Sequence, residues 1–183
     1  MNRVTIQDLY EQLKEPLLLD LLSDMPAEPI LVQAPDVHRP GMALMGFAEN
    51  FLSHRIQVFG ESETAFLSNL DEDEQRAAVE RVLSLEPPVI FVAMDKTVPK
   101  AVMDLIRELK FPLIRTPLTA VEFMSELSHH LEKAFSPKTE VHGTLVDVYG
   151  VGLLFTGRSG IGKSECALDL IERGHRLVAD DIV

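Results

Sequence analysis

Eight consecutive residues near the end of the chain have the types and spacing of a loop that holds phosphate. Gly157 to Ser164 fit the pattern G-x-x-x-x-G-K-S/T. Glycines let backbone N–H groups converge on one anion because no Cβ stands in the way. Lys163 would carry a positive charge to the outer phosphates, and Ser164 would offer its hydroxyl to Mg²⁺. The rest of the cradle would be Gly157, Arg158, Ser159, Gly160, Ile161 and Gly162.

The residues on each side of this loop predict the strand and the helix that such a loop requires. The apolar run 151–156 lies between two glycines, so we expect a buried strand. Residues 163–173 carry apolar side chains at helical spacing, and Gly174 follows as a helix-ending residue. The order of strand, loop and helix favours a phosphate-binding loop over the alternative, a glycine-rich structural turn.

A second candidate strand, residues 176–179, is followed by two carboxylates, Asp180 and Asp181. Enzymes with a phosphate-binding loop need an acid at such a strand end, to hold Mg²⁺ or to position the attacking group. Neighbouring strand residues point to opposite faces, so one carboxylate could face the phosphate while the other has a different role. The alternative interpretation is a solvated turn after a strand.

The composition limits the classes of protein that fit. The 183 residues suit one or two domains, and the formal net charge of −12 argues against a wide nucleic-acid-binding surface. The single cysteine, Cys166, excludes an internal disulfide, and we expect it to be a small core residue. No apolar run is long enough to span a membrane, and residues 1–6 lack the apolar segment of a signal peptide. We therefore expect a cytoplasmic protein.

The first 135 residues predict strands that alternate with helices. This order indicates an α/β domain with parallel strand pairing. Two segments are ambiguous: residues 17–22 fit a helix turn or a strand, and residues 42–47 fit a helix or a strand equally well. The predicted strands are 30–33, 55–59, 89–93 and 111–114; the predicted helices begin near Ile6, Thr64, Asp71, Pro99 and Leu118.

Residues 135–139 are the best candidate for a linker, so we predict domains at 1–135 and 136–183. After the linker, residues 140–149 alternate as a strand does, and Tyr149-Gly150 would turn the chain back as a hairpin. Such a hairpin would bring His142 toward the phosphate end of the loop, although the sequence does not fix its register.

Several stretches resemble the HPr kinase/phosphorylase family. The similarity is most specific over 142–165 and 172–181, around the phosphate loop. Residues 39–47 and 55–60 also match the pattern of the N-terminal domain of that family. The resemblance implies an N-terminal α/β domain followed by the start of a P-loop kinase core similar to phosphoenolpyruvate carboxykinase.

The resemblance also implies an activity. Members of the family phosphorylate a serine of the phosphocarrier protein HPr with ATP or pyrophosphate. They reverse the reaction with inorganic phosphate, which releases pyrophosphate. They are bacterial, cytoplasmic homo-hexamers that depend on Mg²⁺ and regulate the use of carbon sources.

By resemblance, Lys163 matches the catalytic lysine of the family, and Ser164 matches its Mg²⁺ ligand. Asp181 matches the carboxylate that takes the serine proton, Asp180 would support it or join the metal shell, and His142 matches an active-site histidine. Arg158 departs from the pattern, since the family often has an acid there. The cradle does not need that side chain.

Members of the family extend well past Val183, so the chain resembles a fragment that lacks part of the catalytic domain. Two alternatives therefore stay open. One is a P-loop kinase acting on a small molecule, and the other is a catalytically incomplete module that serves only for binding or assembly.

Overall fold

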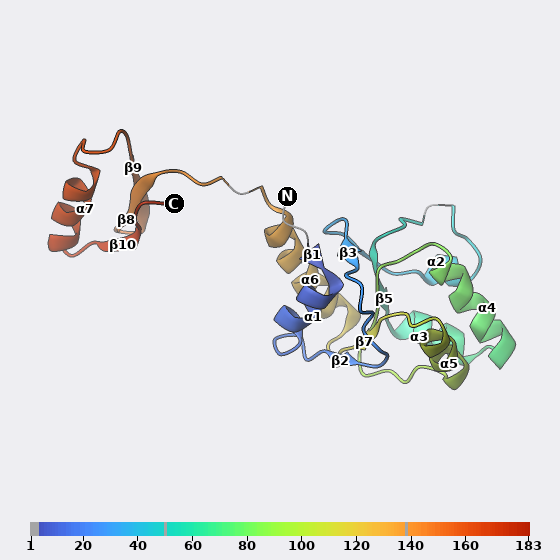
Figure 1. The fold of residues 1–183 in the computed structure, drawn as a ribbon. Helices are drawn as coiled ribbons and strands as arrows, with labels where there is room; N and C mark the ends of the chain where they lie inside the picture. The colour runs from blue at the N-terminus through green and yellow to red at the C-terminus, as the bar shows by residue number, and fades with distance from the viewer. Residues whose placement is uncertain (1–3, 50, 138) are drawn as a thin grey trace. The chain divides into compact units, whose positions relative to one another are not determined.

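A computed structural model describes residues 4–49, 51–137 and 139–183 (Figure 1). The chain forms two compact units, one ending at Ser136 and the other beginning at Pro137. Among the described residues, no helix is both long and apolar enough to cross a membrane.

The first unit contains strands β1 (Val4–Thr5), β2 (Asp20–Leu21), β3 (Leu31–Val32), β4 (Val37–His38), β5 (Ile56–Phe59), β6 (Ile90–Val92) and β7 (Leu113–Arg115). Its helices are α1 (Ile6–Leu13), α2 (Gly41–Leu44), α3 (Glu61–Ser68), α4 (Glu72–Leu83), α5 (Lys100–Glu108) and α6 (Ala120–Phe135). The first ambiguous segment forms a turn and then β2, and the second forms the short helix α2.

The main sheet of this unit has the strand order β2-β7-β6-β5-β4. Strands β4 to β7 are parallel to their neighbours, whereas β2 joins the edge antiparallel to β7. A separate antiparallel pair joins β1 to β3. The predicted α/β class and the predicted parallel pairing are therefore confirmed for the first unit.

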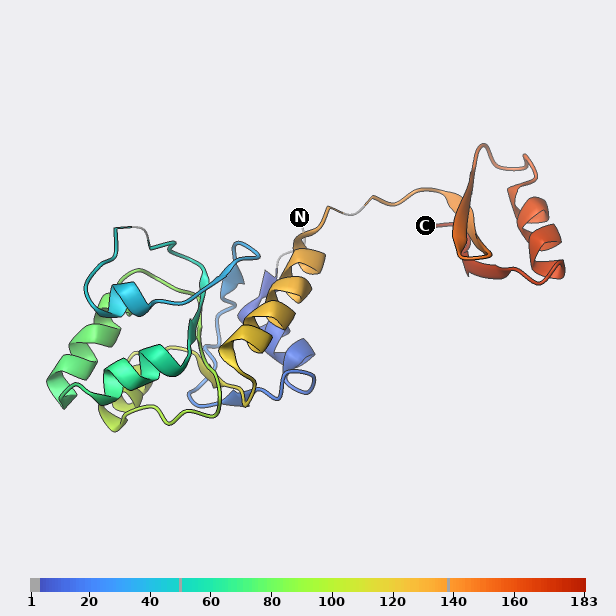
Figure 2. The ribbon, with the colours of Figure 1, turned by 180° about the vertical axis from the view of Figure 1, so that it is seen from behind.

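Helices cover both faces of this sheet (Figures 1 and 2). Along β6 and its flanks the side chains alternate between two buried clusters. Phe91 packs with α1 and α6, whereas Ile90 and Val92 pack with α2 to α5. Burial on both faces explains why the run 89–93 is continuously apolar.

The longer helices begin at side-chain caps that the sequence supplies. Asp71 caps α4 through the backbone N–H of Glu74, 2.9 Å away, and Glu74 accepts in return from the N–H of Asp71. Thr119 and Glu122 make the same reciprocal pair at α6. Hydrogen bonds from the hydroxyl and the backbone of Thr119 lower the pKa of the Glu122 carboxyl.

The second unit contains β8 (Gly143–Val148), β9 (Val151–Thr156), α7 (Lys163–Glu172) and β10 (Arg176–Ala179). Its sheet has the order β10-β8-β9, and both outer strands run antiparallel to β8. Tyr149 and Gly150 connect β8 to β9 with φ of 54° and 85°. Positive φ at both central residues is typical of a tight hairpin turn. The predicted hairpin is confirmed, and its register pairs Gly143 with Thr156.

The expected burial in the second unit was wrong at two places. Residues 151–156 form a strand, but the strand is largely exposed, with Val151 at 61%. The expected core residue Cys166 is exposed as well. Little of this unit is covered: β9 is an edge strand with mostly exposed side chains, and α7 buries only Ala167. An apolar sequence therefore predicted the strand and the helix correctly without predicting what covers them.

Phe123 holds α6 to the sheet, since its ring is fully buried and lies 4.7 Å from the ring of Phe91, centroid to centroid. We expect Phe123→Ala to lower the free energy of unfolding of the first unit by about 3–5 kcal/mol, because it leaves a cavity. Urea denaturation measures this change. Val121→Ala is the matched control on the same helix, since Val121 is 77% exposed and should change stability by less than about 0.5 kcal/mol. Equal effects of the two substitutions would contradict this packing.

Candidate functional site

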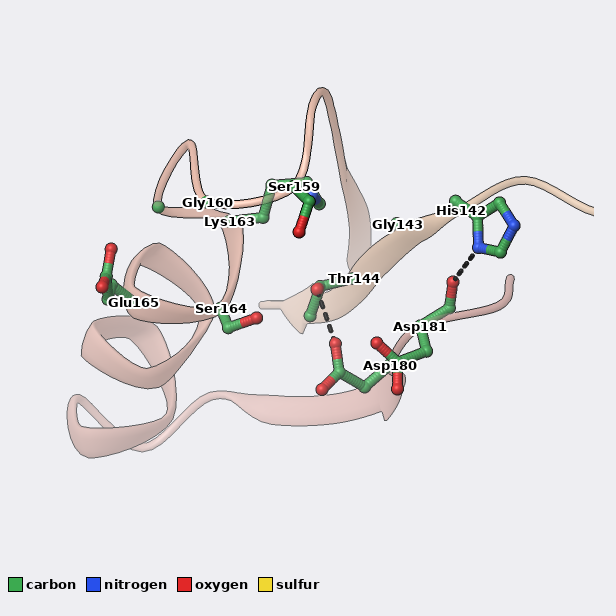
Figure 3. Close-up of a pocket in the computed structure, with 11 residues that line it drawn as sticks. His142, Gly143, Thr144, Ser159, Gly160, Lys163, Ser164, Glu165, Asp180 and Asp181 are labelled. Atoms are coloured by element: carbon green, nitrogen blue, oxygen red, sulfur yellow. Dashed lines mark hydrogen bonds between the residues drawn. The ribbon is translucent and has the colours of Figure 1, made fainter.

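Three segments of the second unit meet around one cavity of about 490 Å³ (Figure 3). They are the start of β8, the glycine-rich loop with the first turn of α7, and the end of β10. The cavity is lined by His142, Gly143, Thr144, Ser159, Gly160, Gly162, Lys163, Ser164, Glu165, Asp180 and Asp181.

The loop before α7 owes its shape to glycines with positive φ. Gly160 has φ of 80°, and Gly162 has φ of 97° at the position that caps α7. L-residues with a side chain rarely adopt this conformation. Because the cap is a glycine, no capping side chain accepts a hydrogen bond from the first N–H groups of α7. These N–H groups and the partial positive charge of the helix end can therefore face an anion.

Lys163 lies folded back over the loop. Its Nζ donates to the carbonyl oxygens of Gly157 and Arg158, at 3.1 and 3.2 Å. The ammonium group is therefore held beside the loop, where it can reach an outer phosphate. Ser164 follows it and also lines the cavity. Gly157, Arg158 and Ile161 belong to the loop but are not among the residues that line the cavity.

Both carboxylates after β10 line this same cavity. The alternation of a strand would have separated them, but β10 ends at Ala179, and Asp181 has the left-handed φ of 67°. Asp180 is held in place by Thr144, whose buried hydroxyl donates to its Oδ1 at 2.6 Å (Figure 3). Strand alternation would have let the two carboxylates point to opposite faces, but both residues line one cavity.

His142 comes to the cavity through backbone pairing with the end of the chain. It bridges to Ile182, and the N–H of Gly143 donates to the carbonyl oxygen of Asp181 at 3.2 Å. The Nδ1 of His142 lies 3.2 Å from the same carbonyl oxygen. In the tautomer that carries its proton on Nδ1, His142 donates there, which leaves Nε2 free to accept a proton.

The oxygen donors around the cavity fit the needs of Mg²⁺. This ion prefers carboxylate and hydroxyl oxygens, and it commonly takes one or two protein carboxylates together with water and substrate phosphates. Ser164, Asp180 and Asp181 are donors of this kind. The described residues hold no group of three or more His, Cys, Asp or Glu side chains placed to bind a metal by themselves. Mg²⁺ would therefore depend on phosphate oxygens to complete its shell.

Sequence reasoning missed three residues of the lining, Gly143, Thr144 and Glu165. Thr144 could have been found, because in a strand it shares a face with His142 two positions earlier. Gly143 is explained by close approach: a Cβ there would lie 2.5 Å from the carbonyl oxygen of Phe155 on β9. Gly143 and Thr144 become recognisable as part of the site only once β8 is known to be the central strand of the sheet, with β9 before the loop and β10 before the carboxylates on either side.

Gly143→Ala should loosen the sheet of the second unit, because the added methyl group cannot coexist with the Phe155 carbonyl in this register. We expect a loss of about 1–3 kcal/mol in the protection of β8 and β9 amides, measured by hydrogen exchange. Gly152→Ala is the control on the paired strand, since its Cβ would meet only Leu145 Cδ1 at 3.4 Å. Unchanged protection in Gly143→Ala would show that the register is wrong.

Comparison with protein families gives two matches that together span most of the chain. Residues 4–131 match the family described as HPr Serine kinase N terminus. Residues 133–183 match the family described as HPr Serine kinase C-terminal domain. The cavity lies within the second match.

Among curated proteins, the chain is similar to several named HPr kinase/phosphorylase. That of Chloroherpeton thalassium is 42% identical over 182 residues, which is 98% of this chain and 54% of the relative. Those of Bacillus cereus and Bacillus cytotoxicus are 39% and 40% identical over 183 residues, covering 100% of this chain and 58% of each relative. The chain thus spans just over half the length of these relatives.

Proposed function

The chain belongs to the HPr serine kinase family, and from this premise we propose that its second unit handles phosphate in the phosphorylation of a serine of HPr and in its reversal. One observation supports this most strongly. Five residues of the loop line one cavity together with His142 and the pair Asp180 and Asp181, although up to 39 positions separate them in the sequence. The five are Ser159, Gly160, Gly162, Lys163 and Ser164.

In the forward direction, the loop N–H groups and Lys163 would hold the phosphates of ATP or pyrophosphate. Asp181 would accept the proton of the serine hydroxyl as its oxygen attacks the terminal phosphorus. The bond from that phosphorus to the leaving phosphate oxygen breaks, and phosphoserine forms. Mg²⁺ bound near Ser164 would neutralise charge on the phosphate oxygens.

In the reverse direction, an oxygen of inorganic phosphate would attack the phosphorus of phosphoserine. The bond to the serine oxygen breaks, pyrophosphate forms, and Asp181 would return the proton to the serine. One carboxylate therefore serves both directions. The loop that binds the donor phosphates in the forward reaction would bind the attacking phosphate here.

The two carboxylates differ in their surroundings, which supports a division of roles. Asp180 is fixed by the hydroxyl of Thr144, as suits a group that holds Mg²⁺ or a bound water. Asp181 follows in a left-handed turn beside His142, with its backbone carbonyl engaged and its carboxylate at the cavity. We therefore assign proton transfer to Asp181 and a supporting or metal-shell role to Asp180.

The remaining expectations from the resemblance are part of this proposal. They are a core like that of phosphoenolpyruvate carboxykinase, assembly as a hexamer and a cytoplasmic location. The net charge of −12 supports a partner other than nucleic acid. The first unit would serve regulation or assembly.

Lys163→Ala should abolish transfer of phosphate from Mg-ATP to HPr, because Lys163 is the one lysine or arginine among the described residues that line the cavity. Transfer is read as the mass shift of HPr. Lys100→Ala is the control, since its side chain is 88% exposed on α5 in the other unit. Full activity of Lys163→Ala would refute the proposed function. Turnover of a small molecule without modification of HPr would favour a small-molecule kinase instead.

Asp181→Asn should lower transfer in both directions by roughly 10²-fold or more, because the amide cannot accept the serine proton. Asp180→Asn should instead raise the Mg²⁺ concentration needed for half-maximal transfer, if its role is to support the metal. Rates measured over a Mg²⁺ series separate the two effects. A lower rate in Asp180→Asn together with a higher Mg²⁺ requirement in Asp181→Asn would contradict this assignment and exchange the two roles.

A further inference from the structure

A second cavity of about 490 Å³ lies in the first unit, where β4 ends and α2 begins. Its volume is within the range of small-molecule sites. In open α/β sheets, ligands bind beyond the carboxyl ends of the parallel strands, and β4 ends at this cavity. The lining consists of His38, Arg39, Pro40, Met42, Ala43, Phe47, Glu49, Phe51, Leu52 and Gln57.

Gln57 is the unexpected residue of this lining. It is 1% exposed and lies within β5. Phe59, two residues further along the same strand, belongs to the apolar cluster under α2 to α5. Its Nε2 donates to the carbonyl oxygen of Arg55 at 3.0 Å. Its Oε1 is buried, and no described residue donates a hydrogen bond to it. A buried acceptor without a donor is costly, so this oxygen calls for a partner that the described residues do not supply.

The rest of the lining suits a flat apolar ring. Phe47 is 67% exposed, Met42 is 60% exposed and Leu52 is 46% exposed, so apolar surface is accessible around this cavity. Phe51 lines the same cavity and packs partly against the core. Aromatic and thioether side chains provide faces on which a planar ring can stack.

The charges of the lining favour a neutral ligand over a phosphate. Arg39 is the one arginine or lysine among the described residues of the lining. Its Nη2 is paired at 2.5 Å with the carboxylate of Glu63, which is itself 4% exposed. Glu49 adds a negative charge to the lining. An anionic ligand would therefore meet no uncompensated positive charge here.

We propose that this cavity binds a neutral purine of the adenine type, as the base or its nucleoside. A glutamine amide pairs with the edge of adenine in two places: its oxygen accepts from the exocyclic amino group, and its nitrogen donates to N7. Gln57 has the free oxygen, and its amide nitrogen carries two hydrogens, of which one is used by Arg55. The ring would lie against Phe47 and Met42.

The test compares adenosine with inosine on the full chain carrying labelled methionine and isoleucine methyl groups, observed by NMR. Inosine replaces the amino group by an oxygen, which would face the Gln57 oxygen. We expect adenosine to shift the Met42 methyl signal saturably, and inosine to bind roughly tenfold more weakly or worse. The methyl signals of Ile161, in the phosphate loop, should not move. Equal affinities, no binding of adenosine, or a shift confined to Ile161 would each overturn the proposal.

Variants of single residues test whether the preference for adenosine over inosine arises at this cavity. Gln57→Met keeps the length of the side chain but removes the acceptor oxygen. The preference for adenosine over inosine should therefore vanish, while the melting temperature of the chain should not fall. Gln33→Met, at an exposed position of the same unit, should keep the preference. Phe47→Ala changes an exposed side chain and should weaken binding of both nucleosides. A retained preference in Gln57→Met, or unchanged binding in Phe47→Ala, would contradict the proposal.

Discussion

The candidate site depends on the pairing of the last residues of the chain with the start of β8. Val141 and Val183 exchange backbone hydrogen bonds of 2.9 and 3.0 Å, and the N–H of Gly143 donates to the carbonyl oxygen of Asp181. These bonds continue the β10–β8 ladder beyond Ala179. They bring Asp181 beside His142. Without this pairing, the carboxylates and the imidazole would have no fixed relation.

Strand β8 also sets the position of the phosphate loop. It pairs with β9, which leads into the loop, and with β10, which leads to the carboxylates. The outer strands are therefore parallel to each other, so their carboxyl ends open toward the same end of the sheet. Thr144, on the central strand, then reaches Asp180 by a direct hydrogen bond. One short strand thus fixes the position of the glycine-rich loop relative to the two carboxylates.

Local patterns predicted most elements of both units, because each pattern has a local cause. The loop glycines, the caps Asp71 and Thr119 and the hairpin turn at Tyr149 all act within a few residues. The register of β8 could not be predicted, because it depends on contacts between residues distant in the sequence. Burial of 151–156 and of Cys166 was wrongly expected, because hydrophobicity does not reveal which element covers a strand or helix. Gln57 gave no signal in the sequence, since a single glutamine in a strand is ordinary until its burial is known.

We propose that the loop, His142 and the two carboxylates form one phosphate-handling site. Titration of the chain with Mg-pyrophosphate, followed through its backbone amide signals, tests this most directly. We expect the amide signals of Gly160 and Gly162 in the loop to shift together with those of His142 and Asp181, along one saturation curve. Shifts of the loop amides alone, or two curves with different midpoints, would contradict it.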